Sequence, residues 1–216
     1  MKLLSFLITL LPATLSAATW TDTWTVPTAI PDNDDVGFTD SRAVSVPGQV
    51  KVDSVTVNLN FTGGWNGDLY AYLVHGTGFT VLLNRPGRDA STRDGSASAG
   101  LNITLDESAT PDIHTAIPMS GGTVIGTFKP DGRTTDPLAV VSTDPRTALF
   151  ASFAGLDLNG GWKLFVADQS PGAISTLQSW SLNATVTSSV YWTGAESSNW
   201  NTSTTNNKGC SETGAR

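Results

Sequence analysis

The residues from Gln49 to Phe61, QVKVDSVTVNLNF, alternate apolar and polar side chains along their whole length. An extended chain places successive side chains on opposite faces, so this period of two predicts a half-buried β-strand. The alternation changes phase around Asp53 and Ser54, which would turn Val50 and Val52 away from the later apolar residues. A bulge at this point would return both sets to one face.

Similar short runs recur between glycines and prolines, and helical periodicity is nearly absent. The further strands that we expect are Asp68–His75, Phe79–Leu83, Leu101–Leu105, Ala148–Phe153, Trp162–Ala167 and Leu177–Val186. The polar stretches Arg85–Ala99 and Asp106–Arg146 are expected to be long loops, which are usually functional, metal-ordered or mobile. No repeat of fixed period indicates a propeller or solenoid. The sequence therefore predicts an all-β fold, a jelly roll or β-sandwich of about eight or nine mostly antiparallel strands.

Both ends of the chain are expected to lie outside this domain. Residues 1–18, MKLLSFLITLLPATLSAA, have the lysine, the short apolar run and the small residues of a secretory signal peptide, with cleavage after Ala17 or Ala18. The run is shorter than the roughly 18 to 20 residues that span a bilayer, and Pro12 interrupts it. We expect residues 19–188 to form the β domain, residues 189–216 to form a Trp/Ser/Asn-rich tail, and the mature chain to be secreted or displayed at the cell surface without a membrane span.

The charge balance restricts the partners. The chain carries 12 Lys and Arg against 19 Asp and Glu, a formal charge of −7, and has no basic run. Such a chain is a poor candidate for binding nucleic acid or an anionic membrane surface. Its single cysteine, Cys210, excludes an intramolecular disulfide, so packing or metal ions must hold the domain together.

The stretch Gly63–His75, GGWNGDLYAYLVH, places a carboxylate and a histidine close in sequence. Its glycines and Asn66 predict a tight hairpin turn between two antiparallel strands, with Asp68 accepting hydrogen bonds from turn amides. Asp68 and His75 would then lie at opposite ends of one strand, more than about 20 Å apart. They are not expected to form a catalytic pair.

No other arrangement predicts catalysis. His114 lies beside Asp112 in a proline-bounded segment, and no Gly-x-Ser-x-Gly elbow occurs. The two histidines and the cysteine have no recognisable zinc spacing. Glutamate is scarce, although paired carboxylates for glycoside chemistry stay open. We therefore expect no catalytic residues and no enzymatic activity in this chain.

The acidic segment at residues 32–35, DNDD, offers the hard oxygen ligands that calcium prefers. We predict a calcium site formed by Asp32, Asp34 and Asp35, with Asp168 or Asp106 from another strand. The alternative is a solvated acidic turn. Four Asn-x-Ser/Thr sequons, beginning at Asn60, Asn102, Asn183 and Asn201, are expected to be coincidences in a chain rich in Thr, Ser and Asn.

A series of segments in order resembles the P domain (Homo B domain) of the proprotein convertases, the furin- and kexin-like relatives of subtilisin, and its bacterial counterparts. These segments are Ile30–Asp32, Val52–Leu59, Gly67–Leu69, Leu82–Gly87, Phe153–Gly155, Gly161–Asp168 and Leu177–Leu182. The resemblance covers roughly residues 26–186. It departs from the family pattern at Gly63-Gly64 and over residues 106–146.

The resemblance implies a jelly roll that accompanies a subtilisin-type catalytic domain and stabilises it, often with calcium nearby. It implies architectural roles for Asp68, Trp162 and Asp168, and it implies a partner, either a subtilisin-type catalytic domain or other segments of a larger exported protein. It does not imply that the chain is a peptidase. The residues from Val190 to Asn201 are similar to the W-x-G…N-W repeat of autotransporter-like surface proteins, which would make this chain part of a longer protein.

Three functions are thus open. The first is a non-catalytic exported module that stabilises or targets a larger protein associated with serine-type endopeptidase activity. The second is a carbohydrate- or protein-binding jelly roll that uses Trp65 with Tyr70 or Tyr72 as a stacking platform. The third is part of a serine endopeptidase whose catalytic domain is not in this chain.

Overall fold

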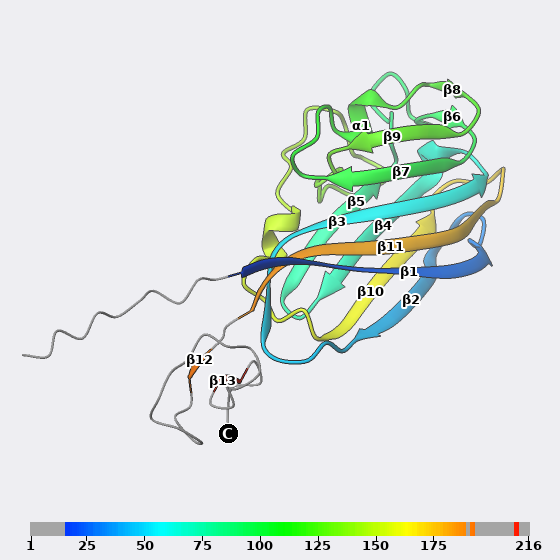
Figure 1. Ribbon diagram of the computed structural model, residues 1–216. Helices are drawn as coiled ribbons and strands as arrows, with labels where there is room; N and C mark the ends of the chain where they lie inside the picture. The colour runs from blue at the N-terminus through cyan, green and yellow to red at the C-terminus, as the bar shows by residue number, and fades with distance from the viewer. Residues whose placement is uncertain (1–15, 189–190, 193–209, 212–216) are drawn as a thin grey trace, which may run out of the picture.

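The computed structural model describes residues 16–188, 191–192 and 210–211. Two stacked sheets form a sandwich (Figure 1). The five-stranded sheet has the order β1 (Ser16–Ala29), β11 (Ser175–Ser188), β3 (Val50–Gly63), β7 (Leu101–Asp106) and β9 (Val124–Phe128). The four-stranded sheet has the order β2 (Asp34–Val44), β10 (Gly160–Asp168), β4 (Leu69–His75) and β5 (Gly78–Asn84). Only β7 and β9 run parallel within these two sheets, so the predicted all-β, mostly antiparallel sandwich is confirmed.

Short elements complete the described chain. Two helices of the 3-10 type, η1 (Asn66–Asp68) and η2 (Phe150–Phe153), and one short α-helix, α1 (Ile113–Ala116), lie in the connections. A small parallel pair joins β6 (Ala97–Ser98) to β8 (Ser120–Gly121), and a small antiparallel pair joins β12 (Tyr191–Trp192) to β13 (Cys210–Ser211). None of the helices in the described chain is long and apolar enough to cross a membrane. Residues 1–15 of the predicted signal peptide and most of the predicted tail lie outside the described residues, whereas Ser16–Ala18, the last three residues of the predicted peptide, begin β1 and pair with β11.

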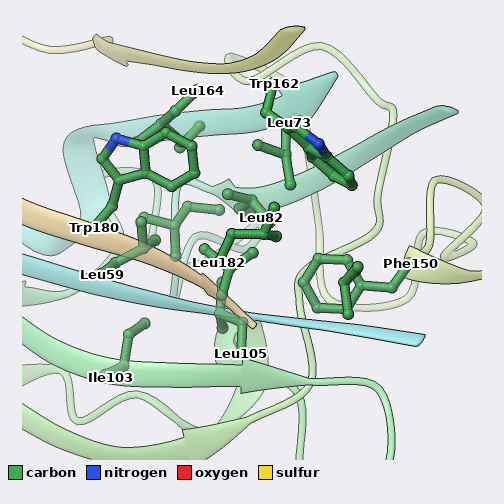
Figure 2. Packing of buried hydrophobic residues seen from close by; sticks show 14 of the residues in the cluster. Leu59, Leu73, Leu82, Ile103, Leu105, Phe150, Trp162, Leu164, Trp180 and Leu182 are labelled. Carbon is green, nitrogen blue, oxygen red and sulfur yellow. The ribbon is translucent and has the colours of Figure 1, made fainter. Parts of the chain in front are cut away.

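The apolar alternation builds the core as expected. Every second residue of β3, β7 and β11 points between the sheets and meets side chains from β4 and β10 (Figure 2). Trp162 and Trp180 are fully enclosed, at 0% and 1% exposure. The phase change in β3 is also confirmed, because Thr185 pairs with Ser54 while Val186 pairs with Val52, which leaves Asp53 as the extra residue of a bulge.

Side chains join the two sheets where β1 and β2 lie at their edges. Trp24 packs on Trp180 with ring centroids 4.4 Å apart. Trp180 Nε1 donates to Asp40 Oδ2 at 2.7 Å, and the same oxygen accepts from Arg42 Nε. The indole is therefore buried with its only donor satisfied, which is the usual requirement for a buried tryptophan.

Three expectations about elements were wrong. Ala148–Phe153 is not a strand, because Phe150–Phe153 forms η2. The strands β1 and β2 were missed, and β9 lies inside the stretch expected to be a loop. Gly63–Asp68 is not a hairpin turn, because β3 and β4 belong to different sheets. Gly67 lies so close to the backbone of Asp94 and Ser96 that a Cβ would be 2.4 Å from it, so this connection is a tightly packed crossing between sheets.

Replacing Trp180 by alanine should lower the free energy of unfolding by about 3–5 kcal/mol, because the substitution leaves a large cavity and removes one of the two hydrogen bonds to Asp40 Oδ2. Urea unfolding followed by fluorescence would measure the change. Trp65, which is 43% exposed, is the matched control, and Trp65→Ala should cost much less. Equal losses for both variants would contradict this placement of the core.

Candidate functional site

Four segments meet at one end of the four-stranded sheet. The turn before β2 contributes Asp32, η1 contributes Asp68, the end of β5 leads into Arg85, and β10 ends at Asp168. They meet because antiparallel neighbours bring the start of one strand beside the end of the next: Asp168 pairs with Asp34 on one side and with Leu69 on the other. We call Asp32, Asp68, Arg85 and Asp168 the acidic end site.

The acidic end site contains two buried carboxyl groups. Asp68 and Asp168 are 1% and 0% exposed. Asp68 Oδ1 lies 3.6 Å from Arg85 Nη2, and Asp168 Oδ1 accepts from Ser170 N at 3.1 Å. The second oxygen of each, Oδ2, is buried without a protein hydrogen-bond partner. Buried polar atoms normally have partners, so two orphaned carboxyl oxygens in one place indicate a site suited to a proton or a cation.

The pKa values of the two buried carboxyl groups agree with this geometry. Burial, with the nearby charge of Asp168, raises the pKa of Asp68 from 3.8 to about 7, although Arg85 opposes the rise. Burial also raises the pKa of Asp168, with a contribution from Asp32. Both carboxyl groups are thus less acidic than free aspartate because the ionised forms lose hydration and repel each other.

The backbone is constrained at the same place. Asn33 and Arg85 are the non-glycine residues of the described chain with positive φ, at 51° and 49°. Arg85 is held there by its own side chain, whose Nε donates to Gly67 O at 2.9 Å and whose Nη2 reaches Ser170 Oγ at 3.3 Å. Such conformations cost about 1–3 kcal/mol each and gather at functional sites.

The structure brings together only part of the predicted calcium set. Asp32 Oδ1 accepts from Gly172 N at 3.0 Å, close to Asp168, which is fully buried. Asp34 Oδ1 instead accepts from Val36 N at 2.9 Å, and Asp35 is exposed. Within the described ranges, no three His, Cys, Asp or Glu side chains are grouped so that they could hold a metal ion. Calcium binding by Asp32, Asp34, Asp35 and Asp168 therefore stays a prediction.

Sequence reasoning missed Asp68 and Arg85 as members of this site. Asp68 was expected to accept from turn amides, but its carboxyl group faces Arg85. The sequence signal was present, since Arg85 follows directly after a buried strand. Asp106, the other candidate ligand, accepts from Ser108 N at 2.7 Å and lies at the end of β7.

Both histidines are engaged by protein acceptors. His75 stacks on Trp162 with centroids 4.0 Å apart, and its Nδ1 and Nε2 lie 3.0 and 2.6 Å from Gly161 O and Asp157 O. His114 is 1% exposed, with Nδ1 2.8 Å from Asp131 Oδ2 and Nε2 2.9 Å from Arg88 O. Burial lowers the pKa of His114, but the hydrogen bond and charge of Asp131 outweigh it and the net shift is upward.

His114 helps to order the long connection between β7 and η2. Asp131 N and Gly132 N donate to Leu82 O and Val81 O, so the connection runs along the edge of β5. Arg133 Nη2 donates to Ser142 O at 2.7 Å, and Arg146 Nε donates to Asp131 O at 2.9 Å. The partner of His114 is therefore Asp131 rather than its sequence neighbour Asp112, which caps α1.

The aromatic residues predicted to form a stacking platform are partly covered by other rings of the protein. Tyr72 stacks on Phe165 with centroids 4.6 Å apart and an interplanar angle of 15°. Tyr70 contacts both of these rings edge-on. Trp65 is exposed but lies against Gly172, where a Cβ would be 2.7 Å from the indole. One ring face of Tyr72 is thus already covered by the protein.

No protein-family model matches the chain, and no curated protein matches it. Similar solved structures include the serine protease of Aeromonas sobria in a complex with a chaperone, with a TM-score of 0.46 and 15% identity over 81% of this chain and 28% of that one. The serine protease of Aeromonas sobria in another crystal structure gives a TM-score of 0.42 and 14% identity over 79% of this chain and 27% of that one. This chain thus spans less than a third of the length of these structures.

The pKa of Asp68 predicts a pH-dependent stability. The native state retains a proton between about pH 4 and pH 7 that the unfolded chain has released, so in calcium-free buffer the free energy of unfolding should fall as the pH rises through this window. The part of the fall due to Asp68 should be about 4 kcal/mol, and Asp68→Asn should remove that part while leaving the contribution of Asp168. Urea unfolding at several pH values measures the slope. Asp35→Asn, at an exposed position, should keep the wild-type slope, and an unchanged slope in Asp68→Asn would exclude Asp68 as its source.

Proposed function

We propose that this chain is a non-catalytic accessory module of the proprotein-convertase P-domain type, exported by its N-terminal signal peptide. Its role is to stabilise or target a larger exported protein, with a subtilisin-type catalytic domain or other segments of that protein as its partner. The non-catalytic part of this proposal rests on one observation: the chain has only two histidines, and their ring nitrogens are all engaged by protein oxygens.

A serine nucleophile needs a base with a ring nitrogen free to take its proton. All four ring nitrogens of His75 and His114 lie within 3.0 Å of a backbone carbonyl or carboxylate oxygen. Both rings are buried, and their partners join segments far apart in sequence. Each histidine therefore joins distant segments through hydrogen bonds, which supports a structural module rather than a peptidase.

The purified chain should neither hydrolyse casein nor react with a fluorophosphonate probe for activated serines. Mass spectrometry of the probe-treated chain, with active subtilisin as the positive control, checks both expectations. Stoichiometric labelling of one serine, together with casein turnover that the probe abolishes, would refute the proposal.

The stabilising role has a separate test. Adding the full chain to a subtilisin-type protease from which its own C-terminal β module has been deleted should slow thermal inactivation of that protease. A destabilised variant of this chain, Trp180→Ala, is the control for non-specific protection by added protein. Equal protection by both proteins, or by neither, would exclude stabilisation of such a partner.

Calcium belongs to the same proposal. The orphaned oxygens of Asp68 and Asp168 have the chemistry that calcium prefers, and Asp32 adds charge beside them. In this arrangement Asp168 from the predicted set would hold the ion together with Asp68, because no three carboxylates of the described residues are grouped closely enough to share it. The cation would neutralise two carboxylates that otherwise repel each other, so it would stabilise the native state.

After treatment with EDTA, addition of calcium should raise the melting temperature. At 100 times the dissociation constant the gain is about 2.7 kcal/mol, or roughly 5–10 °C for a domain of this size. Asp168→Asn should abolish the rise, whereas Asp35→Asn should retain it if only the acidic end site binds calcium. An unchanged melting temperature in the wild-type chain would exclude the calcium site.

A further inference from the structure

The outward face of the five-stranded sheet is built almost entirely from hydroxyl and amide side chains. These residues alternate with the core residues of the same strands, and the strand register aligns them in rows across the sheet. The rows are Thr19–Thr185–Ser54, Thr21–Asn183–Thr56, Thr23–Ser181–Asn58–Thr104–Thr127 and Thr25–Ser179–Asn60–Asn102, and the exposed Ile125 of β9 continues the last row. We call these four rows the hydroxyl–amide face.

The four rows of the hydroxyl–amide face contain no charged residue. Charged side chains lie at its borders: Asp106 continues the second row and accepts from Ser108, and Lys51 and Asp53 follow the first row, where Asp53 accepts from Thr187 Oγ1. Solvation alone does not require such an exclusion of charge, so the composition indicates a surface adapted to a neutral ligand.

The strand β1 extends this pattern to the edge of the sheet. Its segment from Thr19 to Thr25, TWTDTWT, places a threonine at every second position, and all four threonines are exposed. Side chains on such a face repeat about every 6.6–6.8 Å along a strand and about 4.7–4.9 Å across strands. The result is a dense two-dimensional array of neutral hydrogen-bond donors and acceptors.

Two hollows open in the face. One, of about 360 Å³, is lined by Thr19, Thr21, Ser54, Thr56, Asn183 and Thr185, with Val55 and Ala184 at its base. The other, of about 150 Å³, is lined by Thr23, Asn58, Asn60, Asn102, Ser179 and Ser181, with Leu59 and Trp180 at its base. The larger lies at the low end of the usual range for ligand pockets, roughly 300–1,000 Å³.

The chemistry of the face selects among ligands. An anionic ligand would call for Arg or Lys, and the rows offer neither. Protein interfaces concentrate Tyr, Trp, Phe, Met and Arg and are depleted in Ser, the opposite of this composition. A twist of about 20–25° between neighbouring strands prevents five strands from matching a planar crystal surface. A neutral, flexible chain rich in hydroxyl groups satisfies all three conditions.

We therefore propose that the hydroxyl–amide face binds a neutral polysaccharide chain. The ligand lies across the strands, and its hydroxyl groups exchange hydrogen bonds with Thr, Ser and Asn in the two hollows. Each bond changes the affinity only about two- to twelvefold, so binding depends on many contacts in parallel. This site is distinct from the aromatic platform of Trp65, Tyr70 and Tyr72, and from the acidic end site.

The same alternation accounts for three of the sequons. A strand places an asparagine and the threonine two residues later on one face, as at Asn60, Asn102 and Asn183. Asn60 and Asn102 are also direct neighbours across β3 and β7. The sequons are therefore a consequence of how the hydroxyl–amide face is built.

Affinity electrophoresis of the full chain in native gels tests the proposal. The gels contain soluble mixed-linkage β-glucan, arabinoxylan, glucomannan or dextran, with alginate as the anionic comparison. At least one neutral polysaccharide should retard the chain, and alginate should not. If none of the neutral polysaccharides retards it, or if alginate retards it equally, the proposal is wrong.

Variants locate the site. Thr21→Val with Thr23→Val removes two hydroxyl groups while keeping side-chain shape and strand propensity, and should weaken binding about five- to 150-fold. Thr39→Val with Ser41→Ala, at exposed positions of β2 in the other sheet, should bind like the wild type. Asn58→Asp, which adds a charge to the middle of the face, is a second test that does not depend on the threonines. Melting temperatures establish that each variant is folded.

Full binding by folded Thr21→Val/Thr23→Val and Asn58→Asp variants would overturn the assignment. A further measurement tests whether the face binds ice instead of polysaccharide. If the wild-type chain shapes or slows ice growth and the valine variant does not, the face binds ice rather than polysaccharide, and the proposal is again wrong.

Discussion

The burial of every second side chain between two sheets is the constraint from which the rest of the structure follows. The chain has one cysteine, so no intramolecular disulfide supplements this core. Trp162 and Trp180 fill its two halves, and each directs its indole N–H to a specific oxygen, Leu158 O and Asp40 Oδ2. The Trp180–Asp40 hydrogen bond joins β11 to β2 and so links the two sheets, whereas Trp162 is satisfied within the segment that leads into its own strand. What remains for function is therefore confined to the outer faces and to the ends of the strands.

The acidic end site shows how the order of antiparallel strands brings distant side chains together at one end of a sheet. Asp68 and Asp168 are far apart in the sequence, yet β4 begins where β10 ends, so two carboxyl groups become neighbours in a buried place. One cation, Arg85, reaches Asp68 at 3.6 Å and is shared with Gly67 O. Burial of two carboxyl groups against one guanidinium leaves excess negative charge, and protons or a metal ion are the two physical means of relieving it.

The sequence predicted the parts of the fold that depend on local alternation. The bulge at Asp53 and most strands of both sheets followed from side-chain period alone. The strand β1 was missed although its TWTDTWT segment alternates threonine with aromatic residues, a pattern typical of strands, whereas β2, DDVGFTDSRAV, carries charge and glycine, as edge strands commonly do. The turn at Gly63–Asp68 was misplaced because glycines determine how sharply a chain turns but not which sheet it enters. Asp131 as the partner of His114 depends on tertiary contacts that no local pattern encodes.

The two outer faces of the sandwich differ, and the difference bears on what the chain can contact. On the four-stranded sheet, Tyr70, Tyr72, Phe79 and Phe165 pack on one another around partly exposed rings. On the five-stranded sheet, aromatic rings point inward and the outside is hydroxyl and amide. Aromatic surfaces suit contact with another protein, whereas neutral polar arrays suit hydrated, neutral ligands. A module with one face of each kind could contact a protein partner and a polysaccharide at once, because the core between the sheets keeps the two faces on opposite sides.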